Sequence, residues 1–246
     1  MPYEPKNYRE LYKEKDLYHF QVTIEETDLD IAIRQERFNP KIKDMVYLLV
    51  QKERLLLKEY IKKDPEFITA LEPYTPLPGA PLSALSMSKA AQLAGVGPMA
   101  AVAGYFSEIV GKMLSNYSSE VIVENGGDIW LKLKKTRTVG IFAGNSPFSN
   151  RIGLEINPNR TPLGICTSSG TVGHSLSFGK ADAMVIVAES AILADAVATA
   201  ACNLVKSERD LERAVNFALD IPGVIGALSI LGDKIAAKGY IRLVTL

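Results

Sequence analysis

Ala194-Asp195-Ala196-Val197-Ala198-Thr199-Ala200 is an alanine-rich stretch that carries one acid and one hydroxyl. Asp195 and Thr199 are four residues apart, so in a helix they share one face. An acid among small apolar residues is costly to bury unless it is paired or bound to a cation. A carboxylate and a hydroxyl oxygen suit Mg²⁺, which prefers oxygen ligands and keeps substrate phosphates as co-ligands. The stretch therefore predicts either a metal site or a buried aspartate that accepts hydrogen bonds from backbone amides.

The segment upstream, Thr167-Ser168-Ser169-Gly170-Thr171-Val172-Gly173-His174-Ser175, is rich in hydroxyls and follows the apolar run 163–166. Such a loop presents hydroxyl and backbone N–H groups that suit phosphate oxygens. His174 is one of only two histidines in the chain. An imidazole can move a proton near neutral pH, although a lone histidine is as often structural. We expect Thr167, Ser168, Ser169 and Gly170 to bind a ligand and His174 to be the catalytic candidate.

Further upstream, Glu124-Asn125-Gly126-Gly127-Asp128 directly follows an apolar strand-like run. Paired glycines let the backbone approach a ligand closely or adopt positive φ. Asn-Gly is also a strong signal for a β-hairpin turn. The pattern therefore predicts either a ligand-binding turn, to which Asn125, Gly126, Gly127 and Asp128 contribute, or a simple hairpin.

The rest of the chain predicts an α+β protein, because helices arrive in pairs and strands in runs. Proline-rich residues 72–82 are expected to be an ordered loop within one domain that spans residues 1–246. Two half-buried strands over 17–25 and 28–34, joined by a turn near Glu26-Thr27, precede a long amphipathic helix over 42–63. The other expected helices cover 83–94, 98–115, 190–205 and 211–219, and the other strands 121–123, 129–133, 138–142, 152–156, 184–187, 224–231 and 240–244.

Composition excludes several classes of protein. The 246 residues carry zero formal net charge, with lysines interleaved among acids, which argues against a nucleic-acid binder. The amino terminus has no apolar signal-peptide core, and no stretch reaches the run of about 18 apolar residues that a membrane helix needs. We therefore expect a cytoplasmic protein with no membrane partner. Two cysteines without a C-x-x-C and two histidines make a tetrahedral zinc site hard to build.

The three segments, in this order, resemble the ApbE-like superfamily, whose characterised members are FAD:protein FMN transferases. The superfamily's Ala-Gly-Gly-Asp-like turn corresponds to residues 125–128, its Thr-Ser-Gly segment to 167–170, and its Ala-Asp-Ala-x-Ala-Thr-Ala helix to 194–200. The resemblance covers about residues 97–205. It implies an α+β fold related to the T-fold, with a divergent part over 1–82 and the core over 83–246. It also implies Mg²⁺ held by Asp195 and Thr199, and FAD or another flavin or nucleotide as ligand.

The sequence departs from the transferase pattern at two places. Transferases usually carry His-x-Ile-Asp-Pro-x-Thr-Gly, whereas Ser175-Leu176-Ser177 follows His174 here, and Ala103 stands where their lysine is expected. Three hypotheses remain: transfer of FMN to a hydroxyl of an acceptor protein, nucleotide or flavin binding without turnover, and an accessory role in thiol or sulfur chemistry through Cys166. The apolar segment 83–115 suits a homo-oligomer interface and the monomer interior equally well.

Overall fold

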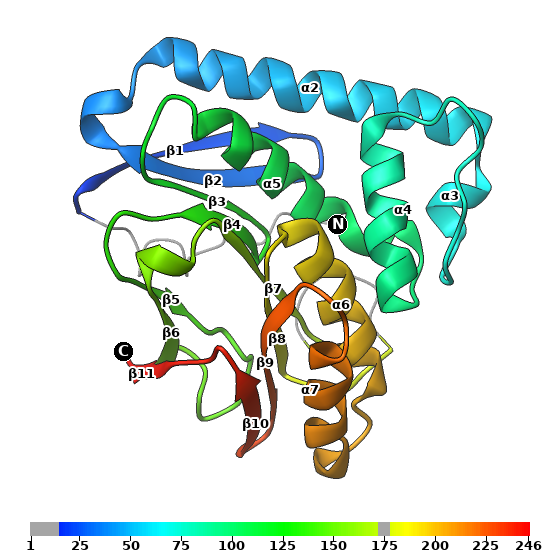
Figure 1. Cartoon of the computed structure of the whole chain (residues 1–246), viewed down its shortest axis with the longest axis vertical. Coiled ribbons are helices and arrows are strands. Elements are labelled where there is room, and N and C mark those ends of the chain that lie inside the picture. The colour runs from blue at the N-terminus through cyan, green and yellow to red at the C-terminus, as the bar shows by residue number, and fades with distance from the viewer. Residues whose placement is uncertain (1–14, 172–177) are drawn as a thin grey trace.

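Residues 15–171 and 178–246 are described by the computed structural model, and they form two antiparallel sheets packed with helices (Figure 1). The larger sheet has eight strands in the order β1-β2-β3-β4-β7-β8-β9-β10, and the smaller has three in the order β11-β6-β5. Strands from residues 17–34 and from 224–239 thus belong to the same sheet. The α+β class expected from the sequence is confirmed.

Most elements lie where the pattern of apolar residues predicts them. The strands are β1 (Leu17–Ile24), β2 (Thr27–Arg34), β3 (Val121–Asn125), β4 (Asp128–Lys132), β5 (Arg137–Gly140), β6 (Ile152–Ile156), β7 (Leu163–Ser168), β8 (Ala183–Ala188), β9 (Val224–Leu231), β10 (Lys234–Gly239) and β11 (Leu243–Thr245). The helices are α2 (Pro40–Lys63), α3 (Glu66–Thr69), α4 (Leu82–Ala94), α5 (Val102–Leu114), α6 (Ala191–Leu204) and α7 (Leu211–Leu219), with short 3₁₀ helices η1 (Gln35–Arg37), η2 (Pro98–Ala101), η3 (Pro158–Arg160) and η4 (Glu208–Asp210).

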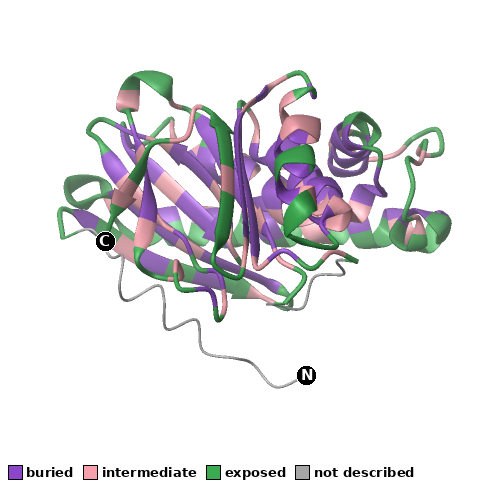
Figure 2. Cartoon of the chain, turned by 90° about the horizontal axis from the view of Figure 1, so that it is seen from below, coloured by how far each residue is buried: buried purple, intermediate pink, exposed green. Residues whose placement is uncertain are grey.

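The two faces of the large sheet are buried in different layers. Side chains alternate between the faces of a strand, so Trp130 packs among the helices while the adjacent Leu131 packs toward the small sheet. Helices α4 to α7 cover the first face, and β5, β6 and β11 cover the second. Strand β8 is buried along its whole length, and Figure 2 shows buried strands at the centre of the molecule.

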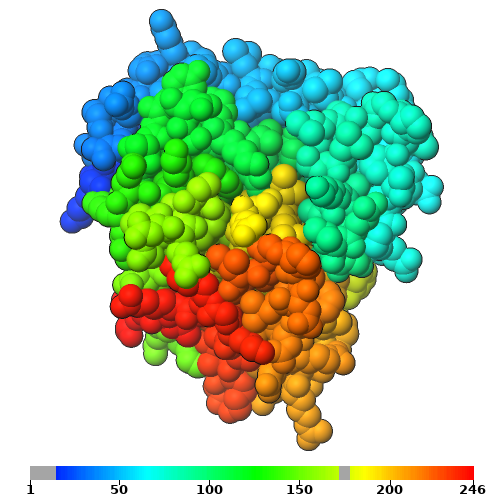
Figure 3. Space-filling view, in the orientation of Figure 1, coloured from blue at the N-terminus to red at the C-terminus, as the bar shows by residue number. Residues whose placement is uncertain are grey.

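Helix α2 lies along the outer edge of the fold and covers β1 and β2 (Figure 1). It begins after Asn39, whose side chain accepts a hydrogen bond from Ile42 N at 3.3 Å. Arg54 on α2 binds Glu26 in the β1–β2 turn at 2.5 Å. In the space-filling view, α2 (blue) and α7 (orange) form opposite ends of the visible surface (Figure 3). The ion pair between Arg54 and Glu26 therefore attaches α2 to the β1–β2 hairpin of the large sheet.

The β1–β2 turn is at Glu25 and Glu26, one residue before the expected place, because Thr27 already pairs with Ile24. Two other local predictions were wrong. The expected helix over 98–115 is divided into η2 and α5. The expected strand over 240–244 is replaced by β10, which pairs with β9, and β11, which pairs with β6 in the other sheet. Strand β10 is an exposed edge strand with little apolar alternation, so periodicity did not reveal it.

In the described ranges 15–171 and 178–246, no single helix combines the length and the apolarity needed to cross a membrane. Helix α4 and the segment Pro98–Leu114 meet that test only as a pair, and the chain bends by 102° between them.

Candidate functional site

The structure brings the Gly-Gly turn, the end of β7 and the first half of α6 together. A Cβ atom added to Gly127 would lie 4.0 Å from the carbonyl oxygen of Thr167. Asn125 Nδ2 donates to the carbonyl oxygen of Ala103, 3.2 Å away, at the start of α5. Asp195 Oδ2 accepts from the backbone nitrogen of Gly104 at 2.8 Å. The N-terminus of α5 is therefore the place where these segments meet.

The Gly-Gly segment forms the two-residue turn of the β3–β4 hairpin. Asn125 pairs with Asp128, and Gly126 and Gly127 have φ values of 68° and 106°. Positive φ at both central residues is typical of a type I′ turn, which explains the two glycines. Glu124 Oε1 accepts from Gly127 N at 2.8 Å. The hairpin interpretation is confirmed, and the turn also lies beside the end of β7.

Asp195 accepts hydrogen bonds from the first turn of α5. The residue before α5, Ala101, offers no side-chain cap, and the backbone amides of Gly104 and Ala103 bind the Asp195 carboxylate instead. The helices approach so closely that a Cβ on Gly104 would lie 2.2 Å from the oxygen of Ala191 and 2.8 Å from Asp195 Cβ. The backbone-amide alternative for Asp195 is thus present. Thr199 lies one turn further along α6, and both side chains are partly exposed.

Burial is the main cause of raised pKa values for two carboxyl groups of this region, Asp195 and Asp128. Burial raises the pKa of Asp195 to about 7, against the lowering effect of the amides of Gly104 and Ala103. Burial raises the pKa of Asp128 well above its usual range, and the charges of Asp195 and Glu124 raise it further. No Lys or Arg in residues 15–171 or 178–246 forms an ion pair with Asp128 or Asp195. The two carboxyl groups can therefore bind a positively charged group of a ligand.

The hydroxyl-rich segment is only in part a loop. Thr167 and Ser168 are the last residues of β7, and Ser168 is buried. Gly170 N donates to the carbonyl oxygen of Ala181 at 2.9 Å. Ser169 Oγ lies 3.3 Å from the hydroxyl oxygen of Thr171, which also donates to Asp182 Oδ1 at 3.0 Å. The hydroxyls of Ser169 and Thr171 are thus engaged within the protein, whereas Thr167 lies beside the Gly-Gly turn. His174 lies outside the described residues.

Cys166 does not have the surroundings of a reactive thiol. Its side chain is fully buried, and Sγ donates to the carbonyl oxygen of Ala191 at 3.3 Å. Burial, together with the charges of Asp128 and Asp195, raises the pKa of the Cys166 thiol well above its usual range. Reactive cysteines have lowered pKa values and some exposure, so the hypothesis of thiol chemistry loses its support. Cys202 is buried within α6.

The sequence interpretation missed Glu108, which lies on α5 near Asp195. Its side chain is 4% exposed, and Oε2 accepts from Ser190 Oγ and Ala191 N, each at 2.7 Å. The feature that could have revealed it is the one that revealed Asp195, namely the only acid of a helix made mostly of apolar residues.

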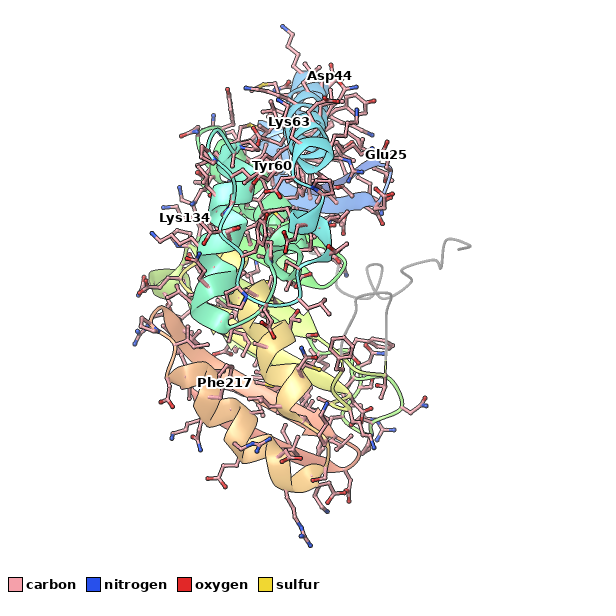
Figure 4. The ribbon with its side chains drawn as sticks, turned by 90° about the vertical axis from the view of Figure 1, so that its right-hand side faces the viewer. Glu25, Asp44, Tyr60, Lys63, Lys134 and Phe217 are labelled. Carbon is pink, nitrogen blue, oxygen red and sulfur yellow. The ribbon has the colours of Figure 1, made fainter. Side chains whose placement is uncertain are left out.

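An open hollow lies elsewhere, along the outer side of α7. Phe217, labelled in Figure 4, is part of its lining, and none of the residues of the three segments lines it. Its other lining residues are Arg209, Glu212, Arg213, Asn216 and Asp220.

Comparisons with known proteins identify the family of this chain. A family model described as AbpE bacteria matches residues 9–230. A UPF0280 protein of Methanopyrus kandleri is 44% identical over 232 residues, which are 91% of this chain and 91% of the relative. A UPF0280 protein of Methanococcus aeolicus is 38% identical over 230 residues, which are 92% of this chain and 91% of the relative.

Solved structures of ApbE proteins have the same fold. The ApbE protein of Thermotoga maritima superimposes with a TM-score of 0.56 at 15% identity, covering 92% of this chain and 99% of that chain. The flavinyl transferase ApbE of Pseudomonas stutzeri gives a TM-score of 0.54 at 12% identity, covering 91% and 94%. At these identities the likeness concerns the fold. The chain therefore belongs to the AbpE bacteria family and has the fold of the ApbE flavin transferases.

Proposed function

We propose that the protein binds a flavin nucleotide together with Mg²⁺ and transfers FMN from FAD to a Ser or Thr hydroxyl of an acceptor protein. The observation that carries the proposal is the position of Asp195, a partly exposed carboxylate between the Gly-Gly turn, the end of β7 and the start of α5. The shared fold with proteins named flavin transferase ApbE supports the substrate class.

The residues of the site fit a magnesium ion. Asp195 offers carboxylate oxygen and Thr199, one turn along the same helix face, offers a hydroxyl. Burial of the Asp195 carboxylate without a cationic partner raises its pKa to about 7, which is the condition that a bound divalent cation would relieve. Oxygen ligands of this kind are the ones that Mg²⁺ prefers. When bound, Mg²⁺ would neutralise the pyrophosphate charge and stabilise the phosphate leaving group.

The residues of the chain then have separate roles in the transfer. The acceptor hydroxyl oxygen bonds to the phosphorus of the FMN moiety, the bond to the AMP phosphate breaks, and AMP leaves with the electron pair. The hydroxyl proton passes to a base, for which His174 is our candidate. The raised pKa of Asp128, caused by burial and by the charge of Asp195, favours its neutral form, which limits repulsion beside Asp195. In this proposal Gly126, Gly127 and Thr167 lie along the route by which the nucleotide reaches Asp195.

The direct test is incubation of the protein with FAD, Mg²⁺ and a candidate acceptor protein. We expect release of AMP and flavin fluorescence that stays with the acceptor on a denaturing gel. An acceptor whose target Ser and Thr residues are replaced by Ala is the matched control. Neither AMP nor labelled acceptor, with FAD still bound, would overturn the transferase proposal.

A second candidate function is flavin or nucleotide binding without turnover. It is favoured by Ala103, which stands where transferases carry lysine, and by the internal bonds of Ser169 and Thr171. It predicts calorimetric binding of FAD with Mg²⁺, recovery of intact FAD after prolonged incubation, and no AMP.

A further inference from the structure

Glu108 holds the N-terminus of the helix that carries the candidate metal ligands. Its Oε2 accepts three hydrogen bonds: from Ser190 Oγ at 2.7 Å, Ala191 N at 2.7 Å and Ile192 N at 3.3 Å. Its other oxygen, Oε1, accepts from Lys112 Nζ at 2.5 Å. Both oxygens of this buried carboxylate are therefore used, and most of the bonds go to the first turn of α6.

The arrangement is reciprocal. Asp195 on α6 accepts from Gly104 N in the first turn of α5, and Glu108 on α5 accepts from Ala191 N in the first turn of α6. The two helices lie side by side (Figure 1), and a Cβ atom on Gly104 would lie 2.2 Å from the carbonyl oxygen of Ala191. Each carboxylate thus receives the partial positive charge of the other helix's N-terminus. Hydrogen bonds at two places along the contact between the helices restrict both sliding and rotation of α6 against α5.

This geometry also determines what an anionic ligand can use. A free helix N-terminus is a ready site for phosphate, because its first amides have no partner within the helix. Here Glu108 occupies the first amides of α6, and Asp195 those of α5. A phosphate in this region therefore depends on a cation that Asp195 holds, and the position of Asp195 depends on how α6 is held.

We propose that Glu108 is a positioning residue of this site: it fixes the first turn of α6 so that Asp195 and Thr199 present their oxygens to the metal. The inference rests on the proposed function. The Asp195 carboxylate must both accept a hydrogen bond from Gly104 N and bind the cation. A small displacement of α6 therefore changes the affinity for the metal. Glu108 touches neither metal nor nucleotide and acts through α6.

The experiment measures FAD binding by calorimetry at increasing Mg²⁺ concentration in three folded variants. E108A should raise the Mg²⁺ concentration at half-maximal FAD binding by about tenfold, as expected when a residue that supports a metal ligand is lost. E108Q keeps an acceptor oxygen at the same reach and should recover most of the wild-type affinity. E108D keeps the charge but withdraws it by one methylene, and should also raise the Mg²⁺ midpoint, which keeps the test available if E108A does not fold.

Glu120 provides the matched control. It is buried to the same degree, with 3% of its side chain exposed, but it binds Arg137 Nε at 2.9 Å, on β5 of the small sheet. E120A should lower the melting temperature and leave the Mg²⁺ midpoint unchanged. An unchanged midpoint in E108D, or a larger shift in E108Q than in E108D, would overturn the positioning role. Absence of Mg²⁺-dependent FAD binding by the wild-type protein would overturn the proposed function and this inference with it.

Discussion

Asp195 Oδ2 lies 2.8 Å from the backbone nitrogen of Gly104, 91 residues earlier in the chain. The contact joins α6, which carries the candidate metal ligands, to α5, which follows the 3₁₀ helix η2. One carboxylate thus serves as an N-terminal cap for α5 and as the candidate ligand for a cation. Variants that separate these two uses provide the clearest tests of the site.

Replacement of Asp195 by Asn should abolish the effect of Mg²⁺ while the helix cap is kept in part. The amide oxygen still accepts from Gly104 N, but the charge that attracts Mg²⁺ is lost. Asp195→Ala removes the acceptor too, and should lower the free energy of unfolding by about 1–3 kcal/mol because amides remain unsatisfied. Urea denaturation with and without Mg²⁺ measures both effects. Asp210→Ala, which removes the capping box of η4, is the control, and it should leave the Mg²⁺ effect intact.

Stabilisation by Mg²⁺ should increase with pH. The folded-state pKa of Asp195 is about 7, whereas an unfolded chain has an aspartate pKa of about 3.9. The folded state therefore binds the proton more tightly, so this carboxyl lowers stability as pH rises from the unfolded value toward 7. Mg²⁺ competes with that proton and relieves the charge. We expect a larger Mg²⁺-induced rise in melting temperature at pH 8 than at pH 6, and none in D195N. Equal rises at both values would contradict the assignment.

Replacement of Gly104 by Ala should disturb the site through the helix contact. The new methyl would lie 2.2 Å from the oxygen of Ala191 and must push α5 away from α6. Overpacking of this kind costs about 1–3 kcal/mol. Gly111→Ala is the matched control. Gly111 lies on the same helix as Gly104, but its new methyl would meet the Trp130 ring on β4 at 2.0 Å instead of α6. Urea denaturation should show both losses, whereas FAD calorimetry should show a raised Mg²⁺ midpoint in G104A alone.

Both cysteines should be unreactive in the folded protein. Cys166 and Cys202 are fully buried, and burial raises the pKa of the Cys166 thiol. Titration with a thiol reagent such as dithionitrobenzoate should count no thiol in native protein and two after denaturation in guanidinium. A single fast-reacting thiol that Cys166→Ser removes would restore the hypothesis of thiol chemistry.

Much of the fold was predictable because its patterns are local. The cap of α2 by Asn39, the cap of α6 by Ser190 and the hairpin at Gly126 and Gly127 each depend on residues a few positions apart. Strand β10 was missed because an exposed edge strand needs no apolar face. The chain then passes from β10 in one sheet to β11 in the other within residues 239–243, and no local pattern announces such a change of sheet.

The sequence by itself determined that Asp195 and Thr199 share a helix face, since the helical period places residues four apart on one side. It also determined that an acid in this alanine-rich helix needs a partner. Only the tertiary structure decided which partner, because Gly104 reaches Asp195 through the packing of two helices distant in sequence. The same packing joined Glu108 to Ala191. Hydrogen bonds of this kind depend on how layers pack, and periodicity within one segment carries no information about that.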